Sequence, residues 1–118
     1  MSEKRRHPRV PVPQRVPLRC DIRMGELSFE ATVVDISLGG IGTLVYDAAI
    51  QIDPGTRIGG ARILYPQREP LTVELEIRHV TRIVLPGGGP ANRAGCRIFG
   101  AAQHIEALVQ LFLTGMGE

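Results

Sequence analysis

The chain has 118 residues, enough for one domain with a single modest hydrophobic core. Hydrophobic residues make up 43% of it, and no apolar run approaches the ~18 residues of a membrane-spanning helix, so the composition excludes that class. The formal net charge is +2. The N-terminus is charged and lacks the apolar stretch of a secretory signal peptide, which predicts a cytoplasmic protein.

The positive charge is concentrated at the N-terminal end. Residues 1–23 contain seven basic and two acidic side chains, a net charge of +5, which leaves −3 for the rest of the chain. A basic end on a mildly acidic body predicts an anionic partner at that end.

The basic stretch "RRHPRVPVPQRVP" begins at Arg5 and contains four prolines. Proline fixes its own φ and disfavours helix in the residue before it, so we expect an extended and loosely attached segment. The predicted organisation is therefore a flexible basic arm over residues 1–15 and a folded domain over residues 16–118. Alone, "RRHPR" is more typical of a solvated tail than of a binding site.

Six strands are predicted after the arm. The first, "VPLRCDIRM", alternates apolar and polar residues, which is typical of a strand with one buried face. Glycine and proline mark turns near Gly25 and Pro54, and "PGGGPANR" at 86–93 is expected to be a flexible connection. The predicted strands cover residues 16–24, 27–37, 39–47, 55–65, 71–85 and 94–100.

The periodicity changes only at the C-terminus. Apolar residues spaced by three and four positions predict one buried face of a helix over residues 102–114, ended by Gly115; these residues are Ile105, Leu108, Val109 and Phe112. Short strands without intervening helices favour an antiparallel barrel or sandwich. We expect a mainly β fold, a small six-stranded antiparallel β-barrel with one C-terminal α-helix.

The cysteines and histidines do not form a recognisable metal site. Cys20 and Cys96 lie far apart in the sequence and lack the C-x-x-C spacing of zinc ligands. Two half-buried strand thiols are expected, because a disulfide is rare in a reducing cytoplasm. No metal is predicted.

The second candidate feature is "DISLGG", at the end of a predicted strand. Asp35 and Ser37 are two residues apart and share one face of an extended strand. Gly39 and Gly40 allow unusual backbone angles and a close approach of a ligand or another chain. A carboxylate can accept hydrogen bonds from the N1–H and N2–H₂ edge of guanine, and arginines can bind its phosphates. The same six residues also fit an ordinary turn.

The two features together resemble a known family. Arg5-x-x-x-Arg9 upstream of Asp35-x-Ser37-x-x-Gly40, in a β-rich domain, is similar to the PilZ domain, which binds the bacterial second messenger cyclic di-GMP. The resemblance spans nearly the whole chain. It is strongest to the PilZ half of the flagellar brake proteins, which share the pattern DxSLGGxG.

The resemblance implies a role for each motif residue. Arg5 and Arg9 would bind the phosphates and the Hoogsteen edge of guanine and stack on the purine, which suits the planar guanidinium. Asp35 and Ser37 would bind the guanine edge and nearby backbone, while Gly40 keeps the barrel surface open. Secondary contacts are expected from Lys4, Arg6 and Gly39.

The implied function is a cyclic di-GMP receptor whose arm closes over the ligand and which then signals to a protein partner. That partner would belong to the flagellar motor or switch, which places the protein at the basal body. Lys4 favours an intercalated pair of ligands over a single one, and we expect a monomer or a ligand-dependent dimer. No cofactor besides the ligand is implied.

Alternatives remain open. The chain could be a degenerate PilZ adaptor that acts by protein contact without nucleotide, or a stand-alone PilZ protein that regulates pili, exopolysaccharide or virulence. A general polyanion binder is disfavoured by the aromatic content of 4%, so no nucleic-acid partner is predicted. An enzyme is not predicted, because Glu74, Glu76 and His79 fit a solvated strand face and no nucleophile–base pair is evident.

Overall fold

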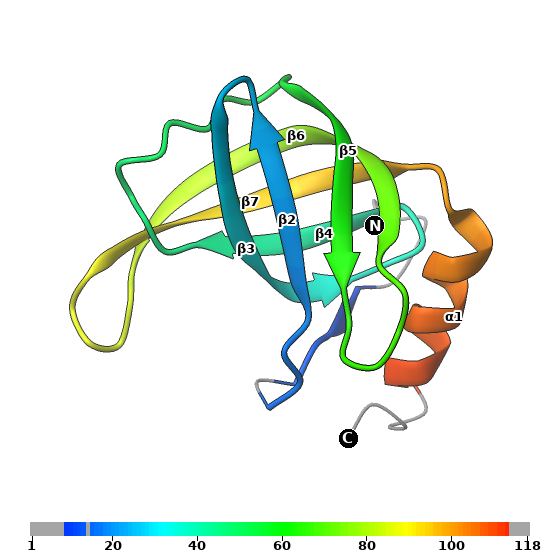
Figure 1. Cartoon of the computed structure of the whole chain (residues 1–118). Helices are drawn as coiled ribbons and strands as arrows, with labels where there is room; N and C mark the ends of the chain where they lie inside the picture. The colour runs from blue at the N-terminus through cyan, green and yellow to red at the C-terminus, as the bar shows by residue number, and fades with distance from the viewer. Residues whose placement is uncertain (1–8, 14, 114–118) are drawn as a thin grey trace, which may run out of the picture.

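The computed structural model describes residues 9–13 and 15–113 (Figure 1). These residues form β-strands and one α-helix, in the order β1 (Val10–Pro11), β2 (Arg19–Met24), β3 (Leu27–Ile36), β4 (Gly40–Val45), β5 (Arg57–Leu64), β6 (Leu71–Val84), β7 (Pro90–Phe99) and α1 (Ala102–Leu113).

Six of these strands form a closed barrel. The hydrogen-bonded order is β3-β2-β5-β6-β7-β4, and β4 pairs again with β3, which closes the sheet on itself. All pairings are antiparallel. Closure removes the open edges of the sheet, and the inward side chains of all six strands fill one core. The predicted six-stranded barrel with one C-terminal helix is confirmed.

The strand β1 lies within the predicted arm. Val10 pairs with Ile36, and the amide of Val12 donates to the carbonyl of Val34 at 2.9 Å. Val10 and Val12 are 6% and 9% exposed, and both belong to the hydrophobic core. Valines alternating with prolines thus give a strand with one buried face, and residues 10–12 are attached to the barrel. The division of the chain at residue 15 stays a prediction.

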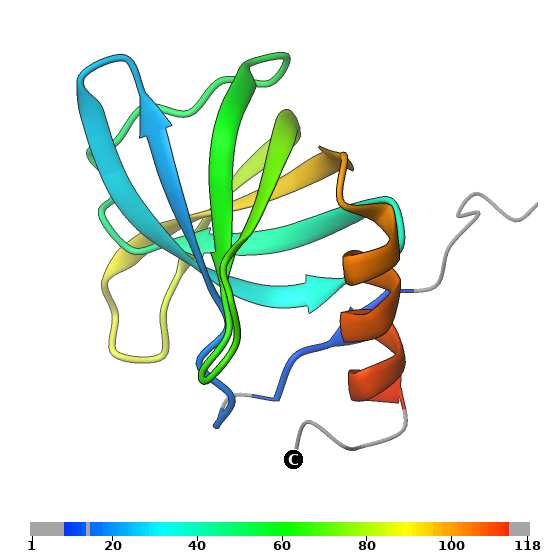
Figure 2. The ribbon, with the colours of Figure 1, turned by 45° about the vertical axis from the view of Figure 1, so that its right-hand side comes forward.

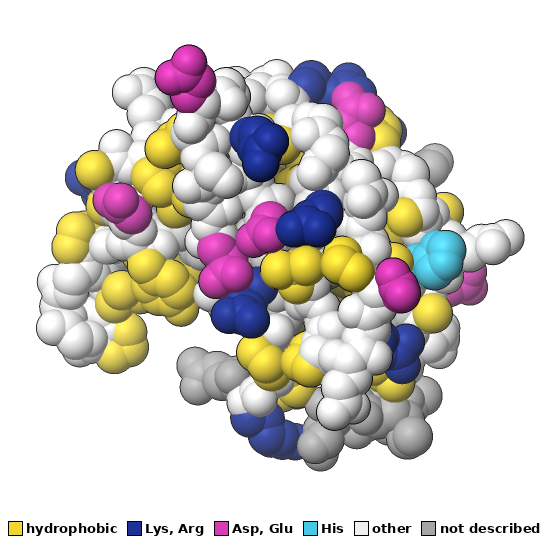
Figure 3. Space-filling view, viewed as in Figure 1, with side chains coloured by type: hydrophobic (Ala, Val, Ile, Leu, Met, Phe, Trp, Pro, Cys, Tyr) yellow, Lys and Arg dark blue, Asp and Glu magenta, His cyan; other side chains and the backbone are white. Residues whose placement is uncertain are grey.

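The last strand is longer than predicted. Residues 90–93 were expected in a flexible connection, but they begin β7, and Pro90 pairs with Val84 at the tip of the β6–β7 hairpin. Proline is tolerated there because it is the first residue of the strand. The turn is closed by the amide of Leu85, which donates to the carbonyl of Gly89 at 2.7 Å. This hairpin projects from the barrel, with apolar side chains on its surface (Figures 1 and 3).

The helix α1 covers one end of the barrel and stands beside β1 (Figure 2). The apolar face predicted from the sequence is confirmed, since its buried residues are Ile105, Leu108, Val109 and Phe112. Phe112 meets the ring of Tyr65 edge-on, with centroids 5.9 Å apart. The predicted stop at Gly115 lies outside the described residues. Within those residues, no helix is long and apolar enough to cross a membrane.

The two cysteines are free thiols inside the core. Burial raises the pKa of Cys20 to about 12 and that of Cys96 to about 11. Both thiols therefore stay protonated and unreactive at neutral pH. Among the described residues, no group of three or more His, Cys, Asp or Glu side chains is arranged to hold a metal ion.

Truncation of the helix core should destabilise the whole domain. Ile105 is fully buried, so Ile105→Ala removes three carbon atoms from a packed interface and should lower the free energy of unfolding by about 2–5 kcal/mol. The exposed neighbour Glu106 provides the control, since Glu106→Ala should change it by no more than about 0.5 kcal/mol. Equal denaturation midpoints for the two variants would contradict the packing described for α1.

The thiols should couple stability to alkaline pH. Each folded-state pKa lies above the ordinary cysteine value of 9.0, so folding favours the protonated thiol. This contribution to stability is complete below pH 9 and is lost as the pH rises towards 11–12. At pH 8, a chromogenic disulfide reagent should label neither thiol in the native protein and both in denaturant. Rapid labelling of the native protein would show that the thiols are not buried.

Candidate functional site

A β-bulge places Asp35 on the outside of the barrel. Val33 pairs with Thr43, but Asp35 pairs with Gly42, so Val34 is an extra residue on β3. The bulge reverses the alternation of side chains. Val33 and Ile36 consequently both enter the core, at 1% and 0% exposed, and Asp35 points outward between them.

Two arginines from distant parts of the chain bind the Asp35 carboxylate. Nη1 of Arg9 donates to Oδ1 at 2.8 Å, and Nη2 of Arg93 donates to Oδ2 at 2.9 Å. These lengths are typical of charge-assisted hydrogen bonds. Asp35 is 9% exposed, so the pairs are partly shielded from water. The structure thus joins one residue of each sequence motif, Arg9 and Asp35, and adds Arg93.

Gly42 supports this cluster by having no side chain. A Cβ on Gly42 would lie 2.6 Å from Oδ1 and 2.8 Å from Oδ2 of Asp35. The carboxylate therefore lies directly over the Gly42 backbone. Any larger residue at position 42 would displace it from the two arginines.

The motif residues Ser37, Gly39 and Gly40 form the turn that follows β3. The amide of Ser37 donates to the carbonyl of Gly40 at 2.8 Å, and the amide of Gly39 donates to Oγ of Ser37 at 3.3 Å. A Cβ on Gly40 would lie 2.5 Å from the carbonyl oxygen of Cys96. Gly40 therefore allows β4 to approach β7 closely. The ligand-binding role that the family resemblance implies for Gly40 stays a prediction.

The glycines continue across the outer face of the barrel. Gly42 pairs with Gly95 of β7, and a second bulge, in β6, pairs His79 with Gly95. A Cβ on Gly95 would meet the His79 ring, so the imidazole lies over that glycine. Asp35 and His79 thus lie at opposite ends of a strip whose floor is Gly42 and Gly95. We refer to these four residues as the glycine strip.

Arginines lie along β7 beside this strip. Arg93 and Arg97 are two positions before and after Gly95, on the exposed face of the strand. The Arg97 guanidinium stacks on the Phe99 ring with its carbon 5.0 Å from the centroid. This part of the barrel surface therefore combines a carboxylate acceptor with arginine donors.

Three predicted site residues, Lys4, Arg5 and Arg6, lie outside the described residues. Sequence reasoning missed Arg93, because the run of glycines and prolines before it was interpreted as a loop. The pattern of Arg93, Gly95 and Arg97 alternating with the apolar Ala94, Cys96 and Ile98 was the signal that could have extended the strand.

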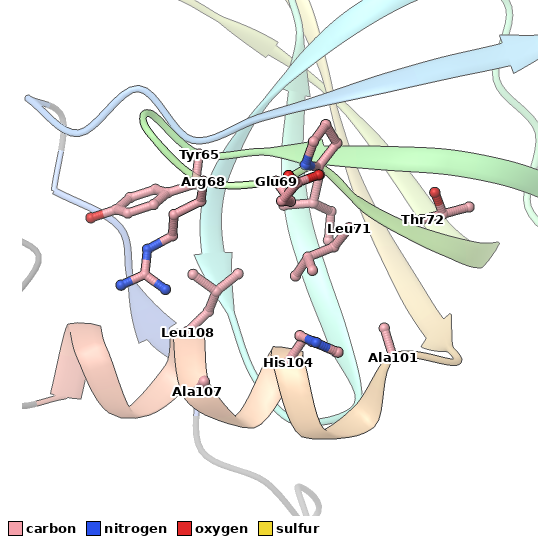
Figure 4. A pocket seen from close by; sticks show the side chains of 11 residues that line it. Tyr65, Arg68, Glu69, Leu71, Thr72, Ala101, His104, Ala107 and Leu108 are labelled. Carbon is pink, nitrogen blue, oxygen red and sulfur yellow. The ribbon is translucent and has the colours of Figure 1, made fainter.

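A separate groove lies between α1 and the β5–β6 turn, with a volume of about 620 Å³ (Figure 4). Leu71 and Leu108 face its interior, and Tyr65, Arg68 and His104 line its sides (Figure 4). It contains none of the motif residues, so we treat the Asp35 cluster as the candidate site.

Comparisons with known proteins identify the family of the chain. The family model described as "PilZ domain" matches residues 3–114. Curated relatives include flagellar brake proteins YcgR of Thiobacillus denitrificans, 28% identical over 97% of this chain, and of Janthinobacterium sp., 26% identical over 95%. The chain spans 46% of the length of each of these two relatives.

Solved structures share the fold. The complex of K. pneumonia MrkH with c-di-GMP matches with a TM-score of 0.85 at 16% identity, covering 98% of this chain and 55% of that one. The PilZ domain of Escherichia coli YcgR with c-di-GMP matches with a TM-score of 0.77 at 18% identity, covering 95% of this chain and 91% of that one.

The two motif-region glycines should respond differently to alanine. Gly40→Ala brings a methyl group against a backbone carbonyl, so we expect a loss of about 1–3 kcal/mol in the free energy of unfolding. Gly42→Ala meets only the end of the Asp35 side chain, which can swing away, so its loss should be smaller. Gly59→Ala, which has open space around its Cβ position, is the control for both. Chemical denaturation would contradict this account if Gly42→Ala were the most destabilised.

Proposed function

Because the chain belongs to the PilZ domain family, we propose that it is a receptor module for cyclic di-GMP. The observation that carries the proposal is the contact of Arg9 with Asp35 across 26 residues of sequence. This contact brings one residue of the arginine motif and one of the "DISLGG" motif to the same point of the barrel surface. Two structural neighbours are complexes with c-di-GMP, which supports the proposal.

Binding would proceed by exchange of partners at Asp35. In the structure, each oxygen of this carboxylate accepts a bond from an arginine. Guanine offers the same kind of donors through N1–H and N2–H₂, and the ligand phosphates offer acceptors to the arginine. When Arg9 moves to a phosphate, the guanine edge takes its place at Asp35. The charge-assisted bonds lost and formed are similar, so the exchange costs little.

The exchange would also move the chain that precedes β1. Arg9 directly precedes Val10, and β1 is a short strand that forms two residue pairs with β3. Residues 1–8 would close over the ligand. In this segment Arg5 is the second proposed ligand-binding arginine, and Lys4 and Arg6 would make secondary contacts. We propose that this closure presents a new surface to a protein partner, as the function of a binding module rather than an enzyme.

We further propose that the process controlled is flagellar motility, since the curated relatives are named flagellar brake proteins. The partner would then be a component of the flagellar motor or switch. Cytoplasmic location and association with the basal body stay predictions from the sequence.

The test is calorimetric titration of the folded protein with cyclic di-GMP. We expect saturable binding of one or two ligands, and a loss of about ten-fold or more in affinity for Arg9→Ala and for Asp35→Ala, because each removes a charge-assisted hydrogen bond. Arg82→Ala is the matched control, because this arginine of β6 donates to the carbonyl of Ala48 and not to Asp35. This variant should leave binding unchanged.

Two further ligands separate this proposal from its alternatives. Linear pGpG and GTP should bind more weakly than the cyclic dinucleotide. A general polyanion binder would instead show little preference among the three and a steep fall of affinity with salt. No heat with cyclic di-GMP, on folded protein, would overturn the proposed function and favour an adaptor that acts by protein contact.

A further inference from the structure

Arg93 and Arg9 bind the same carboxylate but are anchored differently. Arg93 lies within β7, where it pairs with Leu44 of β4 on one side and Thr81 of β6 on the other. Arg9 precedes a two-residue strand that pairs with β3 alone among the described residues. A strand paired on both edges cannot move without breaking the barrel. The Arg93 backbone therefore stays in place when the segment before β1 moves, whereas the Arg9 backbone can move with that segment.

The remaining arginine leaves room for a base at Asp35. An ionised carboxylate has about four lone-pair positions, and the two guanidinium groups use one on each oxygen. When Arg9 departs, the Oδ1 side becomes free and Oδ2 still accepts from Arg93. The edge of guanine needs two acceptor positions, which one carboxylate can provide beside the Arg93 bond.

The orientation of the carboxylate would otherwise be poorly defined. Rotation about the terminal bond of aspartate has broad minima, so the side chain alone does not fix the carboxylate plane. Gly42 supplies a flat floor beneath both oxygens but no hydrogen bond. Arg93 is the group that fixes the direction of this plane while Arg9 is elsewhere.

We infer that Arg93 is a positioning residue that sets base specificity: it holds Asp35 in the orientation that reads the guanine edge. This inference rests on the proposed function. It assigns Arg93 an action through Asp35 and no contact with the ligand. An arginine that bound a phosphate directly would raise affinity for any cyclic dinucleotide, whichever base it carries.

The experiment compares cyclic di-GMP with cyclic di-IMP, whose hypoxanthine keeps N1–H but lacks the 2-amino group. For the unmodified protein, we expect cyclic di-GMP to bind about ten-fold or more tightly, since one hydrogen bond to a charged acceptor is lost in cyclic di-IMP. In Arg93→Gln this ratio should fall towards one, mainly through weaker binding of cyclic di-GMP. Arg93→Lys should keep part of the preference, because it retains the charge without the planar fork.

The matched control is Arg62→Gln. Arg62 also donates from Nη2 to an aspartate Oδ2 on a neighbouring strand, Asp21 at 3.2 Å, but it does so on β5 and away from the glycine strip. This variant should keep both affinities and the full ratio. Thermal melting of each variant shows whether the domain remains folded. If Arg93→Gln does not fold, the affinity ratio of the two ligands is measured on Arg93→Lys instead.

The outcomes distinguish the inference from the proposed function. Equal weakening of both ligands by Arg93→Gln, with the ratio retained, would show a phosphate-binding arginine and overturn the inference. Tighter binding of both ligands by Arg93→Gln would show that Arg93 competes with the ligand for Asp35, and would also overturn the inference. Absence of cyclic di-GMP binding by the unmodified protein would remove the proposed function, and the inference with it.

Discussion

The Asp35 carboxylate, held between two guanidinium groups above a glycine, is the contact on which the candidate site depends. It joins the segment before β1, the end of β3 and the middle of β7, which are remote in sequence. It lies over Gly42, so the sheet itself, and not another side chain, supports it from below. A buried or partly buried carboxylate needs such partners, because without them the charge would be poorly compensated. The same need makes it a place where one set of donors can replace another.

Two bulges shape the outer face of the barrel at the candidate site. In β3 the extra residue Val34 turns Asp35 outward, and in β6 the extra residue Arg78 places His79 outward over Gly95. Between them, Gly42 and Gly95 lie side by side with no Cβ atoms, which leaves room for the Asp35 carboxylate and the His79 ring above them. A regular alternation in β3 would instead direct Asp35 into the core beside Val33. The core residues and the site residues are therefore separated by local irregularities in the strands rather than by separate domains.

Most of the fold could be predicted from the periodicity of the sequence, but the candidate site could be predicted only in part. Alternation together with turn residues located the six barrel strands. Spacing by three and four located the helix face from Ile105 to Phe112, because burial repeats with the backbone geometry. The bulge at Val34 has no such signature, since its effect is to break the alternation. Arg93 was hidden for a related reason: proline and glycine marked a loop, whereas β7 begins at Pro90. Arg93 and Asp35 are 58 residues apart in the sequence, and they meet only because the barrel closes, which local sequence patterns do not reveal.

The central claim is that Asp35 exchanges an arginine for guanine when cyclic di-GMP binds. A crystal structure of the complex tests it most directly. The account predicts N1 and N2 of one guanine within hydrogen-bonding distance of the Asp35 carboxylate, Arg9 turned onto the ligand, and Arg93 still bonded to Oδ2. A complex in which Arg9 keeps its bond to Asp35 and no guanine reaches that carboxylate would contradict it.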